Sequence, residues 1–331
     1  MTIKHFAALM LAAAAIVAAS CTKTAKTTRT PAPAATPIGS FSADSAYRFI
    51  EEQVAFGPRV PGTGAHDSCA NYIIDKLRAY GLDTMLIQHG TVTAYDGSQM
   101  PITNIIAGNK PHVRRRVVLA AHYDTRAWAD REHDEIKSTQ PIVGANDGGS
   151  GVAVLLEIAR NIQLRDPEIG VDLIFFDAED QGAPEELRGD NRGWCLGSEY
   201  WAQHREPYRS DNLPAYGILL DMVGGRDARF YYDLFSQENA PTACIKVWGE
   251  ADALGYGHIF RRQLGGTIID DHVNMTNRGI PTADVIELYN DATGSFPAYW
   301  HTHADDMSII SKSTLQMVGN TVLNVLYKEQ L

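Results

Sequence analysis

"RRVVLAAHYD" occupies residues 115–124 of the chain. Five consecutive apolar residues follow the two arginines and lead into His122 and Asp124. An almost continuous apolar run predicts a β-strand that is covered on both faces, as in parallel sheets. Functional groups gather beyond the carboxyl ends of such strands in open α/β folds, so we expect His122 near a functional site. Asp124 is also compatible with an ordinary surface charge at the end of a strand.

Further strands and helices alternate around this segment. We expect strands at 84–95, 102–109, 171–180, 216–225 and 281–289, and helices at about 42–57, 66–80, 151–161, 197–204, 242–254 and 313–327. The alternation predicts an α/β fold, a three-layer sandwich in which helices flank a mixed, mainly parallel central sheet. Since we find no internal repeat and no second boundary, we expect residues 40–331 to form a single domain.

The charge composition of the chain argues against nucleic acid as a partner. The chain has 331 residues, with 40 acidic and 29 basic side chains and a formal net charge of -11. Because no basic stripe interleaved with aromatic residues is present, we expect no nucleic-acid binding. Besides Cys21 the chain has three cysteines, Cys69, Cys195 and Cys244, whose spacing fits no zinc knuckle; whether two of them pair stays open.

The N-terminus predicts export. Lys4 precedes the apolar run "FAALMLAAAAIVAAS", which is too short for a stable membrane span and predicts a signal peptide at 1–20. "AASC" at 18–21 resembles a bacterial lipobox, in which Cys21 becomes the lipid-anchored first residue; simple cleavage nearby is the alternative. Residues 21–39 are rich in Thr, Ala and Pro and predict a disordered tether. We therefore expect a lipoprotein of the bacterial cell envelope or periplasm.

Several acidic and imidazole groups are expected at one edge of the sheet. Glu179 and Asp180 follow the apolar run "VDLIFF", and Asp221 closes "YGILL". Asp147 lies in the glycine-rich "GANDGGSG", and His301 lies in "FPAYWHTHADD". A divalent cation would relieve the repulsion of these carboxylates, and imidazole with carboxylate oxygen suits zinc. Taken singly, Asp147 also fits a helix cap, and His301 a core histidine.

Seven motifs together carry a resemblance. They are "FGPRVPGTGAH" (56–66), "HYDTR" (122–126), "GANDGGSGVAVLLEIAR" (144–160), "FFDAED" (175–180), "LLDMVGG" (219–225), "DDHVNM" (270–275) and "FPAYWHTHADD" (296–306). From about Phe41 to its C-terminus the chain resembles the superfamily of co-catalytic zinc aminopeptidases and animal-type glutaminyl cyclases. The resemblance implies a zinc-aminopeptidase-like fold and a zinc-dependent catalytic domain.

The resemblance also implies roles for individual residues. One zinc would be bound by Asp147, Asp180 and His301, Glu179 would be the general acid/base, and His122 and Asp221 would bind a second zinc in the peptidases. Cyclases of this type keep a single zinc although equivalents of His122 and Asp221 survive. One ion is therefore expected for a cyclase and two for an aminopeptidase, and the ligand positions alone leave both activities open.

Aromatic residues favour the cyclase. Trp300, directly before His301, resembles the cyclase wall that packs on the substrate glutamine, although core packing would also explain this tryptophan. Asp270 resembles an aspartate of the cyclase hydrogen-bond network, in which Asp221 would also take part. Phe296 and Trp194 are candidate further walls. The implied reaction converts N-terminal glutamine of peptides or proteins to pyroglutamate and releases ammonia.

Two departures from the resemblance stand out. The chain has Glu179-Asp180 where relatives commonly carry Glu-Glu, so one ligand is a methylene shorter. It has Asp284 where animal cyclases have a histidine, which changes the expected hydrogen-bond network. Two alternatives remain: a di-zinc aminopeptidase, and a binding ectodomain that has kept the fold but lost catalysis.

Overall fold

The computed structural model describes residues 34–184, 187, 192–204, 206–208 and 212–330. The predicted signal peptide, the Cys21 anchor and most of the predicted tether lie outside these ranges. Two residues near the end of the predicted tether are hydrogen-bonded to the folded part. The Ala35 amide donates to the Ala253 carbonyl oxygen at 2.7 Å, and the Ile38 amide donates to Asn324 Oδ1 at 2.7 Å.

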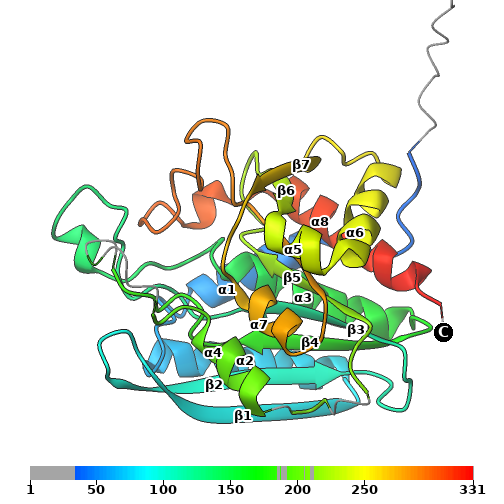
Figure 1. Cartoon of the computed structure of the whole chain (residues 1–331), viewed down its shortest axis with the longest axis horizontal. Helices are drawn as coiled ribbons and strands as arrows, with labels where there is room; N and C mark the ends of the chain where they lie inside the picture. Colours follow the sequence, from blue (N-terminus) through cyan, green and yellow to red (C-terminus); the bar gives the residue numbers. More distant parts are fainter. Residues whose placement is uncertain (1–33, 185–186, 188–191, 205, 209–211, 331) are drawn as a thin grey trace, which may run out of the picture. The chain divides into compact units, whose positions relative to one another are not determined.

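A six-stranded sheet forms the middle layer, in the order β1-β2-β4-β3-β5-β8 (Figure 1). The strands are β1 Thr84–Thr93, β2 Gln99–Gly108, β3 Arg116–His122, β4 Gly170–Phe176, β5 Tyr216–Asp221 and β8 Thr282–Ile286. β2 pairs antiparallel with β1 and β4, whereas β4, β3, β5 and β8 are mutually parallel. The predicted mixed, mainly parallel sheet is confirmed.

Helices cover both faces of this sheet. One face carries α1 Ala43–Val54, α2 Gly64–Tyr80, α3 Gly149–Leu164, α6 Pro241–Ala253 and α8 Lys312–Lys328; the other carries α4 Leu196–His204 and α7 Asp271–Asn277. Side chains of β3 alternate between the two layers, with Val117 and Leu119 in the larger core and Val118 and Ala120 in the smaller. The three-layer sandwich is thereby confirmed.

Sequence patterns missed a second, small sheet. β6 Phe230–Asp233 and β7 Phe260–Gly266 pair in parallel, and α5 Leu234–Asn239 follows β6 directly. β6 is only four residues long, and the middle of β7 is exposed and charged, so neither gives an alternating apolar pattern. The remaining elements within the described ranges are the short 3-10 helices η1 Lys137–Thr139 and η3 Met307–Ile309. No helix in the described part of the chain is long and apolar enough to cross a membrane.

Strand order places the carboxyl ends of β4, β3 and β5 side by side. The chain passes from β3 to β4 through α3, and then returns past β3 to β5. Ligands of open α/β sheets bind where the strand order reverses in this way. Residues after β3, β4 and β5 therefore meet at one edge.

Gly151 sets how closely α3 approaches this edge. A Cβ at Gly151 would lie 2.1 Å from the Leu220 carbonyl oxygen and 2.9 Å from Ala121 Cβ, whereas a Cβ at Gly64 of α2 would meet nothing within 4 Å. We expect Gly151→Ala to lower the free energy of unfolding by about 2 kcal/mol or more, as overpacking does. Urea denaturation measures this change. Gly64→Ala is the matched control, and equal unfolding midpoints for the two variants would contradict the packing argument.

Candidate metal centre and active-site pocket

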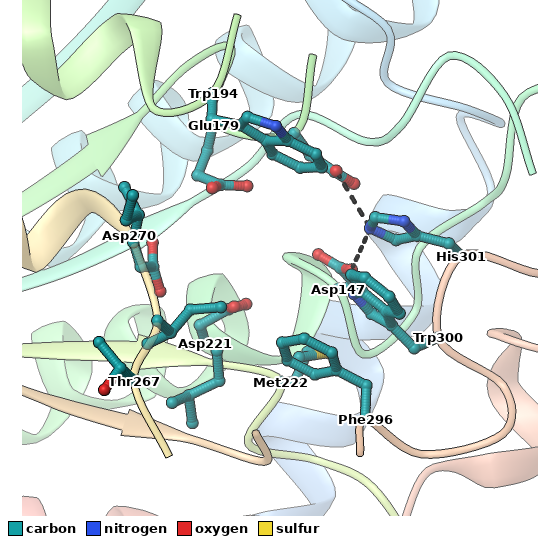
Figure 2. Close-up of a pocket in the computed structure, with 14 residues that line it drawn as sticks. Asp147, Glu179, Trp194, Asp221, Met222, Thr267, Asp270, Phe296, Trp300 and His301 are labelled. Carbon is teal, nitrogen blue, oxygen red and sulfur yellow. Dashed lines mark ion pairs between the residues drawn. The ribbon is translucent and has the colours of Figure 1, made fainter. Parts of the chain in front are cut away.

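A pocket of about 260 Å³ opens at the carboxyl edge of the sheet (Figure 2). Its lining includes nine of the predicted site residues: Asp147, Glu179, Asp180, Trp194, Asp221, Asp270, Phe296, Trp300 and His301. The tenth, His122, is buried beside Asp147 and Asp221. Segments that are far apart in the sequence thus bring all ten together.

Asp147, Asp180 and His301 form a set of ligands that fits a metal ion, and we call these three residues the metal set. His301 Nε2 lies 3.2 Å from Asp180 Oδ1 and 3.8 Å from Asp147 Oδ2. Asp180 Oδ2 is buried and has no hydrogen-bond partner. Buried carboxylates without a partner are costly, and one imidazole with two carboxylates matches the ligand chemistry of zinc.

Asp130 orients the His301 imidazole. His301 Nδ1 lies 3.2 Å from Asp130 Oδ1, which leaves Nε2 to face the carboxylates of the metal set. Arg126 holds Asp130 through both carboxylate oxygens, at 2.8 and 2.5 Å. Burial raises the pKa of Asp130, but the hydrogen bonds and charges of Arg126 and His301 together outweigh burial and hold that pKa below its usual range. Asp130 is therefore ionised and accepts from Nδ1, as the outer carboxylate partners of metal-bound histidines do.

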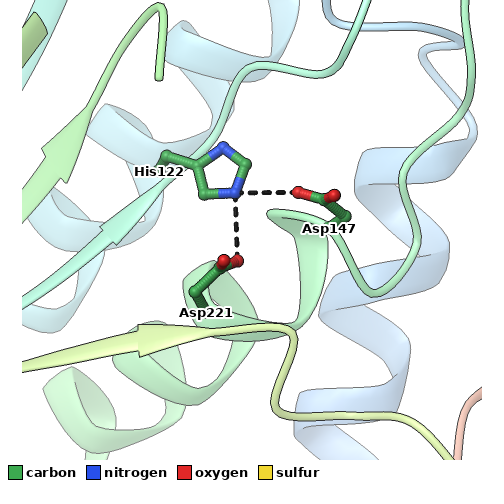
Figure 3. Close-up of side chains that lie close together, drawn as sticks. All are labelled: His122, Asp147 and Asp221. Carbon is green, nitrogen blue, oxygen red and sulfur yellow. Dashed lines mark hydrogen bonds and ion pairs between the residues drawn. The ribbon is translucent and has the colours of Figure 1, made fainter. Parts of the chain in front are cut away.

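His122 lies between two carboxylates (Figure 3). Its Nε2 is 3.1 Å from Asp147 Oδ1 and 3.2 Å from Asp221 Oδ1. The three side chains offer ligand atoms within 4.8 Å of one another. Asp147 thus faces His122 with one oxygen and His301 with the other, as a carboxylate bridging two ions would.

Asp124 is buried, so the surface-charge interpretation is wrong. Its two oxygens accept the backbone amides of Glu179 and Asp180 at 3.0 and 3.1 Å, and Oδ2 also accepts Gln181 Nε2 at 2.9 Å. Asp124 Oδ1 lies 3.4 Å from Nδ1 of His122. One carboxylate from the end of β3 thereby fixes the segment after β4.

Glu179 is placed for proton transfer. It is only 8% exposed, and its Oε1 accepts from the Cys195 thiol at 3.3 Å. Burial, followed by the charge of Asp270, raises the pKa of Glu179 well above its ordinary value. Burial and then the charge of Asp221 raise the pKa of Asp270 to about 7. A raised pKa makes the Glu179 carboxylate a better proton acceptor, as a group that must take up a proton and then return it requires.

Aromatic rings surround the metal set. The Trp300 ring stacks on Phe296, with ring centroids 4.1 Å apart, and on His301 at 3.7 Å. Trp194 lies parallel to the His301 ring at 6.0 Å, and the Arg126 guanidinium lies 4.7 Å from the centre of the Trp194 ring. Because Trp300, Phe296 and Trp194 are half-buried and line the pocket, they have free surface for a ligand. Core packing alone does not account for them.

Backbone strain is concentrated at the same place. Of the six non-glycine residues with positive φ in the described ranges, four adjoin the pocket: Ala178, Cys195, Met222 and His301. Left-handed φ values are costly for side-chain-bearing residues and collect at functional sites. The surrounding packing holds these residues in a conformation that points the neighbouring carboxylates and His301 inward.

Three supporting residues were not identified from the sequence. Asp130 lies in a charge-rich loop that gives no periodic signal, and Cys195 reaches Glu179 only through the fold. Asp305, part of the "FPAYWHTHADD" motif, accepts the amides of Asn146 and Asp147 at 2.8 and 3.1 Å. The cysteine pairing left open by the sequence is now decided, since Cys69, Cys195 and Cys244 are all free and buried.

Known proteins resemble this chain over most of its length. The profile of Peptidase family M28 matches residues 104–326. The glutaminyl-peptide cyclotransferase of Bos taurus is 26% identical over 308 residues, which are 82% of this chain and 78% of that protein.

Solved structures extend the similarity. A glutaminyl cyclase of Bacteroides thetaiotaomicron is 46% identical, with a TM-score of 0.84 over 88% of this chain and 99% of that chain. A Zn-dependent exopeptidase of Parabacteroides distasonis is 44% identical, with a TM-score of 0.83 over 88% of this chain and 99% of that chain. Proteins named for both activities therefore share this fold.

We expect Asp130→Asn to weaken zinc binding about 10- to 100-fold, because an amide orients the His301 ring less strongly than a carboxylate does. Competition against a chromophoric chelator measures the affinity without relying on catalysis. Asp134→Asn removes an exposed carboxylate of the same loop and is the matched control. Unchanged affinity in Asp130→Asn would rule out the orienting role.

Proposed function

Because the chain belongs to peptidase family M28, we propose that it uses this family's scaffold as a glutaminyl-peptide cyclotransferase. Its substrates are peptides or proteins with N-terminal glutamine, which become pyroglutamyl peptides with release of ammonia. The observation that carries the proposal is the pocket itself, in which half-buried aromatic rings and Glu179 surround the His301 metal set. Such a pocket suits one side chain that must fold back onto its own α-amine.

Zinc is the cofactor of the proposed reaction, held by Asp147, Asp180 and His301. When bound there, zinc supplies a Lewis acid for the γ-carboxamide carbonyl of the substrate. The donor set and the unpartnered Asp180 oxygen fit this ion. We expect a single zinc at the reacting centre.

Glu179 moves the proton. The α-amine nitrogen of the substrate forms a bond to the γ-carboxamide carbon, and Glu179 takes the proton that this nitrogen loses. The bond from that carbon to the amide nitrogen then breaks, and Glu179 returns the proton to the departing ammonia. Its raised pKa suits both halves of this transfer. Asp270 and Asp221 line the pocket wall; burial and then the charge of Asp270 raise the pKa of Glu179, and burial and then the charge of Asp221 raise the pKa of Asp270.

The aromatic walls position the substrate. Figure 2 shows Trp300 and Phe296 beside His301, with Asp270 and Asp221 across the pocket from them. Apolar rings of this kind pack on the methylene groups of a glutamine side chain and exclude water. Holding the amine close to the carboxamide carbon lowers the entropic part of the barrier.

A di-zinc aminopeptidase is the second candidate. The observation in its favour is the His122, Asp147 and Asp221 cluster, whose ligand atoms lie within 4.8 Å. Asp147 would then bridge two ions, and Glu179 would activate a water molecule. This activity would remove N-terminal residues from a peptide and would need no aromatic clamp on a glutamine side chain.

We also propose that the protein is exported and anchored by lipid at Cys21, on the basis of the apolar N-terminal run and the "AASC" segment. Secreted proteins that begin with glutamine after signal removal are then its natural substrates. Cys21→Ser should move the protein from the membrane fraction to the soluble fraction of the envelope. Detection of the wild-type protein in the cytoplasm would contradict the proposal.

The activity is tested with zinc-loaded protein and a mixture of peptides that begin with Gln, Leu or Ala. We expect the Gln peptide alone to change, by the mass of one ammonia in mass spectrometry. Glu179→Gln should lower the rate about 100- to 10,000-fold, because general acid/base catalysis is lost. Removal of Leu or Ala would establish the aminopeptidase instead. Unchanged biological function in Glu179→Ala would favour a binding ectodomain.

We expect Trp300→Ala to lower kcat/KM for the Gln peptide about 10- to 100-fold, since burial of a large apolar ring contributes roughly 1.5–3 kcal/mol. Trp300→Phe should recover most of this loss because it keeps a ring in the wall. Zinc content, measured in parallel, should stay at the wild-type level in both variants. Lost zinc in Trp300→Ala would show that Trp300 supports His301 rather than the substrate.

A further inference from the structure

Tyr299 lies directly before Trp300 in the sequence, and its hydroxyl is hydrogen-bonded to two other segments of the chain. Tyr299 Oη donates to Glu287 Oε2 at 2.5 Å and accepts from Asn146 Nδ2 at 3.2 Å. Glu287 directly follows β8, and Asn146 directly precedes Asp147. One hydroxyl therefore connects the segment of the aromatic wall with a strand end and with the loop of a proposed metal ligand.

The turn that carries Trp300 and His301 is bonded to Asn146 from both sides. The Asn146 backbone amide donates to Asp305 Oδ1 at 2.8 Å, beyond the turn, and the Asn146 side chain donates to the Tyr299 hydroxyl. His301 has a φ of +54°, a left-handed conformation that persists only where the surroundings fix it. The Tyr299 hydroxyl is one of the contacts that fix this turn.

The hydroxyl lies in a closely packed polar site. Glu287 is 0% exposed, and its Oε1 accepts from Asn290 Nδ2 at 3.3 Å. A Cβ at Gly225 would lie 2.1 Å from Tyr299 Oη and 2.7 Å from Glu287 Oε2. Burial of a carboxylate is costly, and an apolar pair could fill the same space without that cost. Packing alone therefore does not explain this contact, whereas a bonded polar network fixes one arrangement of the groups that it joins.

The same strand end supports the aromatic wall by apolar packing. Ile286 and Leu288, on either side of Glu287, belong to a buried apolar cluster against which Trp300 packs. Consecutive residues of this strand end thus hold consecutive residues of the wall segment, since Glu287 binds Tyr299 and its neighbours support Trp300. A shift of Tyr299 relative to Glu287 would move the Trp300 ring against its support.

We propose that Tyr299 is a positioning residue for the aromatic wall. Its hydroxyl holds the Trp300 ring at the distance from the metal set at which a glutamine side chain fits, while Tyr299 itself is outside the pocket lining. This role rests on the proposed cyclase function, because the cyclisation is what requires the wall. Misplacement of a positioning group by about 1 Å can lower a rate about 100-fold.

Tyr299→Phe tests the role because it removes the hydroxyl and keeps the ring. We expect kcat/KM for a Gln peptide to fall about 10- to 100-fold. Zinc content should stay at the wild-type level, since Asp130 and Asp305 still hold the metal set. Tyr72→Phe is the matched control: Tyr72 of α2 is also half-buried, lies outside the pocket lining and donates to Glu52 Oε2 at 2.6 Å. This control should leave kcat/KM unchanged.

Two further comparisons separate positioning from a general effect on stability. In the Trp300→Ala background, Tyr299→Phe should cause little further loss, because a positioning residue acts through the ring that is already absent. Glu287→Gln keeps an oxygen that can accept from the hydroxyl and should retain most of the activity. Glu287→Leu removes this acceptor and should lose as much activity as Tyr299→Phe.

Wild-type kcat/KM in Tyr299→Phe would overturn the role, and so would an equal loss in Tyr72→Phe or an undiminished loss in the Trp300→Ala background. If circular dichroism shows that Tyr299→Phe does not fold, Glu287→Gln and Glu287→Leu decide, and equal activities of these two would overturn the role. The proposed function fails in a different way. Wild-type protein that removes Leu or Ala from peptides and leaves the Gln peptide unchanged would overturn the cyclase, and this role with it.

Discussion

Repulsion among buried carboxylates at the carboxyl edge of the sheet is the constraint on which the site depends. Asp147, Asp180 and Asp221 are all nearly inaccessible to water, and an uncompensated buried charge costs several kcal/mol. Imidazoles, the Arg126 guanidinium, backbone amides and the proposed zinc supply the compensation. The chain ends three parallel strands in acidic or imidazole residues, so the fold itself creates a demand for cations at this edge.

The partners that compensate a buried charge also determine which role each of two carboxylates, Asp130 and Glu179, can play. Asp130 is kept ionised by Arg126, whereas the side-chain donor that Glu179 has among the described residues is a neutral thiol, and Glu179 faces the charge of Asp270. The first carboxylate can therefore orient a ligand, and the second can exchange a proton. The cyclase and peptidase candidates both use Asp147, Asp180 and His301 as ligands. The cyclase needs the aromatic wall around His301, whereas the peptidase needs a second ion beside His122.

Much of this arrangement could be predicted from the sequence because its signals are local. The apolar runs of β3, β4 and β5 predicted buried parallel strands, and the polar residues at their ends predicted the edge at which the pocket lies. The sheet of β6 and β7 was missed because its strands are short or exposed. Asp130 and the partnership of Tyr299 with Asn146 could not be found, since each depends on contacts between segments distant along the chain.

Asp124, just after β3, supports two adjacent residues of the segment that follows β4. It holds the amides of Glu179 and Asp180 at once, so the proposed acid/base and a proposed metal ligand have a common backbone support. Changes at this support and at either side chain are expected to be non-additive, because contacting residues share their energetic effects. New activities on this scaffold should therefore arise by changes in the loops that carry Trp194, Phe296 and Trp300, where a ring can be exchanged without disturbing Glu179 or Asp180. The residues at the strand ends should change only together.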